Sequence, residues 1–67
     1  MKLAQTFGRN VRLIRQGKGL TIETLADEVC LSYSYVGELE RGKRNPSFRV
    51  IGRFAEVLGV SPAELLI

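Results

Sequence analysis

The 67-residue chain carries a net charge of +3 and has a sequence pI near 9.5, values that suit one small domain with a polyanionic partner. One cysteine and no histidine exclude an internal disulfide framework and leave Cys/His zinc sites without ligands. We therefore predict a single domain over residues 1–67, with no metal and no cofactor. Because the sequence has neither an apolar run long enough to span a membrane nor a signal-peptide core, we also expect no membrane contact and a cytoplasmic location.

The charged residues are segregated along the chain. Residues 1–19 contain bases and no acid, residues 20–40 contain acids and no base, and residues 41–53 contain bases alone. Such runs are solvated helix faces in most proteins. Folding could also bring the two basic blocks onto one surface, where they would attract a nucleic acid.

Helical spacing of apolar residues begins at the start of the chain. One face of the first predicted helix carries Leu3, Phe7, Val11 and Ile14. The sequence GKG at 17–19 ends this helix, and Thr21 is placed to cap the second one. The buried face of the second helix is expected to contain Leu25, Ala26 and Val29.

A third helix follows the tight connection CLS at 30–32. Ser32 is its predicted N-cap, and Val36 and Leu39 are its predicted buried residues. Gly42 stands where the end of a helix favours a left-handed residue. The third helix is therefore expected to end just before Gly42.

Two further helices are predicted in the last third of the chain. Ser47 follows Asn45-Pro46 and is the expected cap of the fourth helix, which Gly59 ends. Its predicted core residues are Ile51, Phe54, Ala55 and Leu58. The sequence SPAE at 61–64 predicts a fifth helix with a capping box. Five short helices make an all-α fold.

The second and third helices carry the functional signal. A connection of about three residues and the small Ala26 at their crossing predict a helix-turn-helix. Paired helices of this kind also occur in proteins that never touch nucleic acid. The pattern alone therefore favours DNA binding only slightly.

From Phe7 to Leu66 the sequence resembles the Cro/lambda-repressor-like helix-turn-helix family, also called the xenobiotic response element family. The matching segments are VRLIR at 11–15, GLT at 19–21, LA at 25–26, SYSYVGELERGKRNPS at 32–47 and VLGVSPAELL at 57–66. The chain is similar to the short controller proteins of restriction-modification systems and to small phage or plasmid repressors. This resemblance implies a compact five-helix DNA-binding domain that acts as a homodimer on a pseudo-palindromic operator in a bacterial cell, at the nucleoid.

The resemblance also implies roles for individual residues. The third helix would be the recognition helix, and its base-reading positions are Tyr33, Ser34, Gly37 and Glu38. The expected phosphate contacts are Thr21, Tyr35, Arg41, Lys43, Arg44 and Asn45. For each lysine or arginine in this set the alternative is simple solvation. For Tyr35 the alternative is packing against its neighbours. A glycine within a helix costs about 1 kcal/mol relative to alanine, and close approach to DNA or to another helix would explain Gly37.

Three further features complete the expected site. The resemblance implies that Arg15 and Glu40 form a structural ion pair between the first and third helices. Leu65, Leu66 and Ile67 are candidates for the dimer interface, although at least one of them must belong to the core. The sequence departs from the family at Ile22, where glutamine is common, and at Cys30, where glycine is common.

Two classes of function remain open from the sequence. The first is a DNA-binding transcriptional regulator, with RNA polymerase as a further partner if it activates. The second is a protein-interaction module, such as an antitoxin-like partner with weak or lost DNA binding, which the acidic block and Ile22 favour. An enzyme is not expected, because the chain lacks histidine and its acids show no paired catalytic arrangement.

Overall fold

The computed structural model describes residues 2–67, which form four α-helices and one turn of 3-10 helix, with no strand in this range. The elements are α1 (Lys2–Gly17), α2 (Ile22–Val29), α3 (Tyr33–Glu40), α4 (Phe48–Leu58) and η1 (Pro62–Leu65). The predicted all-helical fold is confirmed. Among these residues, no helix is both long and apolar enough to cross a membrane.

The predicted fifth α-helix is wrong, because η1 is a single 3-10 turn. Glu64 accepts a hydrogen bond from the Ser61 amide at 2.8 Å, as the capping box requires. The backbone carbonyls at the end of the chain face α1. The side-chain amide of Asn10 lies 3.1 Å from the Leu65 carbonyl and 3.0 Å from that of Ile67. These contacts tie the end of the chain to α1.

The predicted caps of the other helices are confirmed. The hydroxyls of Thr21, Ser32 and Ser47 each accept a hydrogen bond from the backbone amide three residues ahead, at 3.0, 3.1 and 3.1 Å. Gly42 and Gly59 have φ angles of +74° and +72°, the left-handed geometry expected after a helix. Local sequence thus determines where α2, α3 and α4 begin and end.

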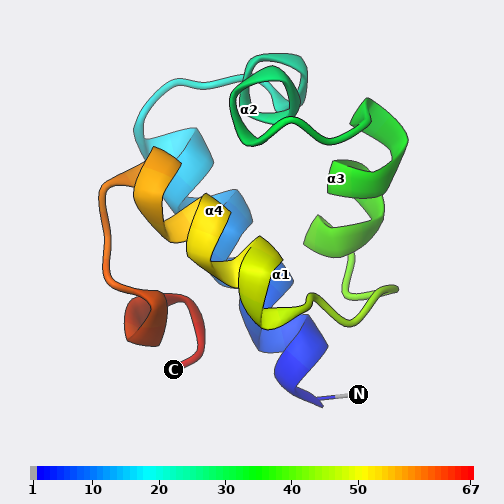
Figure 1. Cartoon of the computed structure of the whole chain (residues 1–67), viewed down its shortest axis with the longest axis vertical. Helices are drawn as coiled ribbons and strands as arrows, with labels where there is room; N and C mark the ends of the chain where they lie inside the picture. The colour runs from blue at the N-terminus through cyan, green and yellow to red at the C-terminus, as the bar shows by residue number, and fades with distance from the viewer. Residues whose placement is uncertain (1) are drawn as a thin grey trace.

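The helices are arranged in two groups around a shared core. Figure 1 shows α2 and α3 on one side of the crossed pair α1 and α4, with the C-terminal segment on the other side. Contacts among residues follow this picture, since α3 packs on α1 and α2, whereas η1 packs on α1 and α4. The α3 helix and the C-terminal residues therefore face different directions.

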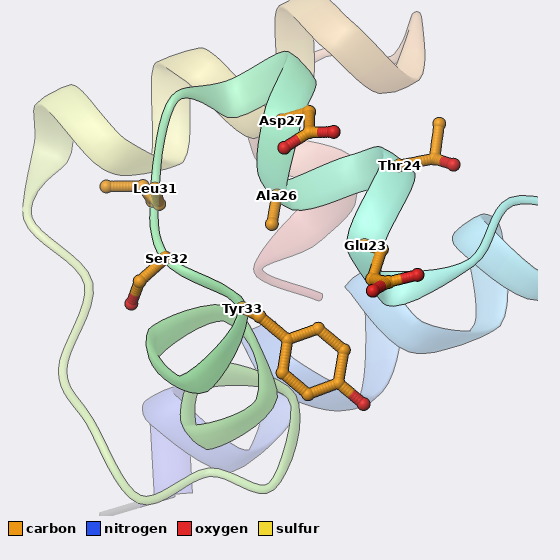
Figure 2. Close-up of a pocket in the computed structure, with 7 residues that line it drawn as sticks. All are labelled: Glu23, Thr24, Ala26, Asp27, Leu31, Ser32 and Tyr33. Atoms are coloured by element: carbon orange, nitrogen blue, oxygen red, sulfur yellow. The ribbon is translucent and has the colours of Figure 1, made fainter.

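The connection between α2 and α3 is short and left-handed at one residue. Cys30 has φ +61° and ψ +42°, a conformation that costs a residue with a side chain about 1–2 kcal/mol. The amide of Leu31 donates to the Ala26 carbonyl at 3.0 Å and closes the turn. Figure 2 shows how the chain reverses through Leu31 and Ser32 before α3 begins. The predicted helix-turn-helix is therefore present.

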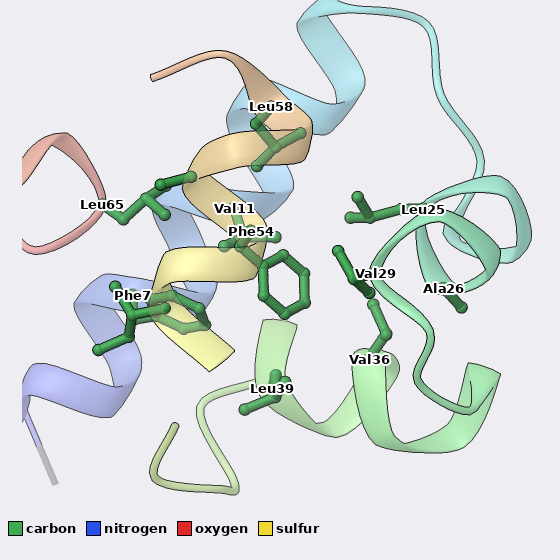
Figure 3. Packing of buried hydrophobic residues seen from close by; sticks show 12 residues of the cluster. Phe7, Val11, Leu25, Ala26, Val29, Val36, Leu39, Phe54, Leu58 and Leu65 are labelled. Atoms are coloured by element: carbon green, nitrogen blue, oxygen red, sulfur yellow. The ribbon is translucent and has the colours of Figure 1, made fainter. Parts of the chain in front are cut away.

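Aromatic and aliphatic side chains from all four helices fill the core (Figure 3). The ring of Phe7 meets that of Phe54 edge to face, with centroids 5.5 Å apart. The predicted core residues of α2, α3 and α4 are confirmed as buried. Leu3 was predicted to be buried and is 49% exposed. Ala4 is buried in its place, because the face of α1 that meets the core runs through residues 4, 7, 8, 11 and 15.

Gly8 brings α1 and α3 into unusually close contact. A Cβ atom at Gly8 would lie 2.2 Å from the Leu39 carbonyl oxygen and 2.7 Å from that of Glu40. Only glycine fits there without moving one of the two helices. The end of α3 is thereby seated directly on the backbone of α1, which holds α3 in place.

Candidate nucleic-acid interface

The outward face of α3 carries three of the four residues expected to read bases. Tyr33 and Ser34 are exposed in the first turn, and Glu38 is half-buried one turn later. Val36 and Leu39 lie on the other face and are completely buried. The helix therefore presents its first turn and one side to solvent, which is the geometry a helix needs to enter a groove.

An open groove of about 490 Å³ lies between the start of α3 and the exposed side of α2. Figure 2 shows Glu23, Thr24 and Asp27 from α2 on one side of it, with the Tyr33 ring reaching toward them from α3. The two carboxylates make this groove unfavourable for a DNA phosphate.

Gly37 does not offer an open surface. It is buried, and the position of a Cβ atom there would lie 3.2 Å from an Nη atom of Arg41. The Arg41 side chain therefore folds back along α3 and covers the glycine. The outer surface at this expected base-reading position is formed by the guanidinium of Arg41, and the sequence pattern did not indicate this.

Arg44 is held against α3 by two neighbours. Its Nε donates to Oε1 of Glu38 at 2.8 Å, and its guanidinium carbon lies 5.8 Å from the centroid of the Tyr35 ring. Tyr35 is half-buried and also packs against the core. One expected base reader, Glu38, and two expected phosphate contacts thus form a single cluster.

The basic loop that follows α3 is exposed but firmly seated. Arg41, Lys43, Arg44 and Asn45 are all exposed. The Lys43 amide donates to the Glu38 carbonyl at 3.0 Å and closes the loop onto the helix. A Cβ atom at Gly42 would lie 2.9 Å from the side chain of Gln5, so the loop also rests on α1. Its charges therefore have a fixed position beside α3.

Arg15 and Glu40 join α1 to the end of α3. Nε of Arg15 donates to Oε2 of Glu40 at 2.6 Å, and Nη2 donates to Oε1 at 3.0 Å. The Arg15 side chain is 11% exposed and that of Glu40 is 4% exposed. Nη1 of Arg15 also donates to the Leu20 carbonyl at 2.8 Å. One buried arginine therefore links α3 to the segment that leads into α2.

Thr21 and Arg53 fix the two ends of α2. The Thr21 side chain is exposed, and its hydroxyl is already hydrogen-bonded to Thr24, so a phosphate would meet chiefly the backbone amides around it. At the other end, Nη1 of Arg53 donates to the Val29 carbonyl at 3.2 Å. That contact from α4 holds the helix-turn-helix on the core and was not foreseen from the sequence.

The C-terminal residues divide between core and surface. Leu65 is completely buried, so its expected place in a dimer interface is wrong: it fills the protomer's own core beside α1 and α4. Leu66 is half-buried, and Ile67 is 83% exposed. Phe48 is 92% exposed and lines a small apolar pocket of about 100 Å³ with Leu3, Leu66 and others.

Leu3, Phe48 and Leu66, which line this pocket, and the exposed Ile67 that follows Leu66 in the chain are called the apolar patch below. Its members come from both ends of the chain and from the start of α4, so their proximity could not be inferred from spacing. Asn45, expected to contact phosphate, lies at the rim of the pocket in this patch. The exposure of two large apolar side chains, Phe48 and Ile67, is the signal that marks the patch as a contact surface.

Comparisons with known proteins agree with this geometry. The family model HTH_3, described as helix-turn-helix, matches residues 11–65. The chain is 44% identical over 62 residues to the uncharacterized HTH-type transcriptional regulator YazB of Bacillus subtilis (strain 168), a match that covers 92% of this chain and 90% of that protein. It is 43% identical over 61 residues to the control protein C.BamHI of Bacillus amyloliquefaciens, covering 90% of this chain and 75% of that one.

A solved structure shows the same fold. The restriction-modification controller protein C.AhdI from Aeromonas hydrophila superposes with a TM-score of 0.90 at 43% sequence identity. The match covers 97% of this chain and 98% of that chain. Both the arrangement of the helices and the length of the chain are therefore similar to those of a controller protein.

Proposed function

Because this chain belongs to the helix-turn-helix family, we propose that it is a sequence-specific DNA-binding regulator of transcription with no catalytic activity of its own. The observation that carries this proposal is the exposed face of α3 beside a basic loop, both seated on the buried Arg15–Glu40 pair. Such a regulator works in the cytoplasm, where it meets the bacterial nucleoid.

In this function α3 enters the major groove. Tyr33 and Ser34 contact base edges, because the first turn of a recognition helix reaches deepest into the groove. The surface one turn later is formed by Glu38 and by Arg41 over Gly37. The exposure of Tyr33 and Ser34, and the firm seating of α3 on Gly8, support these roles.

The phosphate backbone is held on both sides of α3. On one side lie the backbone amides at the start of α2, after Thr21. On the other lies the basic loop, where Arg41, Lys43 and Asn45 meet phosphate, while Arg44 is held against Glu38 and Tyr35. These contacts position the protein without reading sequence, and they make the affinity fall steeply as salt is added.

We propose a homodimer as the binding species. The protomer measures 26 × 23 × 20 Å, whereas two half-sites on one side of a duplex lie about 34 Å apart. One copy therefore cannot occupy both half-sites of a pseudo-palindromic operator. The apolar patch offers a surface for a second copy, and its residues belong to elements other than α3.

The biological role that fits best is control of a restriction-modification system. One similar structure is named as a restriction-modification controller protein and is matched over nearly its whole chain, and one relative is named as a control protein. A small phage or plasmid repressor is the nearest alternative of the same class.

A protein-interaction module is the second candidate function. The observation that favours it is the acidic groove with Glu23 and Asp27 beside the proposed reading face, together with Ile22 where the family has glutamine. Such a module would bind a basic partner and would show no measurable affinity for duplex DNA at low salt.

The proposed function is tested by selecting duplexes with a randomised centre on the purified protein. We expect a pseudo-palindromic consensus and an affinity for random duplex that falls steeply with salt. Tyr33→Ala and Ser34→Ala should alter the selected sequence, whereas Lys43→Ala should weaken binding to all duplexes alike. Recovery of no consensus and no binding at low salt would favour the interaction module, and an unchanged consensus in both α3 variants would contradict the proposed reading face.

A further inference from the structure

The contact between Glu38 and Arg44 gives both residues a role that their positions in the sequence do not suggest. Oε1 of Glu38 accepts a hydrogen bond from Nε of Arg44 at 2.8 Å, and the guanidinium lies over the Tyr35 ring. The carboxylate is thus engaged within the protein. A glutamate on the reading face that is already paired in this way is poorly suited to be the direct reader of a base.

The same contact leaves the far end of the guanidinium open. The Arg44 side chain is 57% exposed, and within residues 2–67 the structure shows no hydrogen-bond partner for its two Nη groups. Those groups carry four N–H donors in one plane. An arginine held at Nε and stacked on a ring therefore presents a fixed two-pronged donor to solvent beside α3.

A contact between Arg44 and a DNA phosphate does not by itself explain why Arg44 is held by Glu38 and Tyr35. Phosphate attraction depends on charge, and a carboxylate 2.8 Å away neutralises much of the arginine's charge. Holding a long side chain in one orientation also reduces its freedom before DNA arrives. Both features favour a contact in which direction matters, such as paired hydrogen bonds to two acceptors on one base.

We propose that Glu38 is a positioning residue that orients Arg44, and that Arg44 is a sequence-determining contact to the edge of a guanine. This role presupposes the regulator function proposed above. Guanine is the base with two adjacent acceptors, O6 and N7, that match the spacing of the arginine prongs. Tyr35 completes the arrangement by supporting the guanidinium from below.

The conservative variant Glu38→Gln separates orientation from charge. The glutamine side-chain oxygen can still accept the hydrogen bond from Nε of Arg44, but it carries no charge. Glu38→Ala removes both. We therefore expect Glu38→Gln to keep the base preference of the unmodified protein and Glu38→Ala to lose it.

The experiment measures the affinity of each variant for the duplex selected by the unmodified protein and for duplexes with single base-pair changes. We expect Glu38→Ala and Arg44→Ala to lose discrimination at the same G·C pair, by about tenfold or more. The double variant should discriminate no worse than Arg44→Ala alone, because Glu38 acts through Arg44. Glu56→Ala, which removes an exposed acid from α4, is the matched control and should leave discrimination unchanged.

Several results would overturn this inference while leaving the proposed function intact. If the losses of discrimination in Glu38→Ala and Arg44→Ala add up in the double variant, Glu38 contacts a base by itself. An equal loss of affinity on every duplex in Arg44→Ala would mean a phosphate contact only. A uniform gain of affinity in Glu38→Ala, with the base preference intact, would mean that Glu38 only repels DNA. If the unmodified protein selects no sequence at all, the regulator function itself fails.

Discussion

Two glutamates that lie two residues apart on α3 have different surroundings. The side chain of Glu40 is 4% exposed and is paired with the buried Arg15, whereas that of Glu38 is 35% exposed and is paired with the exposed Arg44. A buried ion pair that loses one partner leaves a charge that neither water nor protein compensates. An exposed pair loses little when it is broken, because water and salt already screen it. Burial therefore decides that Glu40 is structural and that Glu38 is available for function.

Replacing Glu40 with alanine is expected to lower the free energy of unfolding by about 3 kcal/mol, because Arg15 would remain buried with only the Leu20 carbonyl as its acceptor. Thermal and urea unfolding followed by circular dichroism would measure the change. Glu56→Ala, an exposed residue on α4, serves as the control and should change stability by less than about 0.5 kcal/mol. A melting temperature for Glu40→Ala equal to that of the unmodified protein would refute the structural role.

At the scale of elements, the position of α3 depends on its contact with α1. Gly8 allows the carbonyls of Leu39 and Glu40 to rest on the backbone of α1, and the Arg15–Glu40 pair closes the same junction two turns further along. Arg53 from α4 holds the end of α2. The helix-turn-helix is therefore fixed at several points to a rigid support, which keeps its exposed face in one orientation.

Two glycine-to-alanine substitutions are expected to have opposite effects. At Gly8 the added Cβ would meet the Leu39 carbonyl oxygen at 2.2 Å, so α1 and α3 must separate, and we expect a loss of about 1–3 kcal/mol. At Gly52, on the exposed side of α4, nothing lies within 4 Å of the added atom. There alanine should increase stability by about 0.5–1 kcal/mol, because glycine disfavours helix.

Urea unfolding of both variants checks this pair of predictions. If Gly8→Ala also shifts the selected DNA sequence or weakens binding, the junction between α1 and α3 governs the orientation of the recognition helix. A Gly8→Ala variant as stable as the unmodified protein would contradict the close contact described for these two helices.

Across the whole molecule, the open face of α3 and the apolar patch lie on different elements. The basic loop and the open face of α3 are placed together, whereas the apolar patch combines the start of α1, the start of α4 and the C-terminal residues. This separation suits a protein that contacts DNA and a second copy of itself at the same time. Two members of the apolar patch, Phe48 and Ile67, are the most exposed of the large apolar side chains.

Replacing Phe48 and Ile67 together with serine is expected to shift the protein toward monomer without unfolding it, because both side chains are exposed, 92% and 83% respectively. Sedimentation velocity over a range of concentrations would measure the shift. Affinity for a duplex with both half-sites should fall far more than affinity for a single half-site. Leu13→Ser is a matched control, since Leu13 is 58% exposed on α1 but does not line the patch. An unchanged dimer in the double variant would exclude this surface.

Much of the fold follows from short-range signals in the sequence. The caps Thr21, Ser32 and Ser47 act on backbone amides within three residues, so their effect does not depend on the rest of the molecule. Gly42 and Gly59 end helices because left-handed geometry is nearly free of cost for glycine. Apolar periodicity identified the buried faces of α2, α3 and α4 for the same reason, since it reflects the geometry of a single helix.

Only the tertiary structure decided which residues meet across elements. Leu65 and Ile67 are two residues apart and equally apolar, yet one fills the core and the other is exposed, while the Asn10 amide contacts the carbonyls of both. Glu38 meets Arg44 and Gly37 lies under Arg41 because the basic loop folds back along α3. The sequence by itself determined the four α-helices, the turn and the family. Which side chains meet depends on how the loop after α3 and the C-terminal segment pack on the helices, which no local pattern encodes.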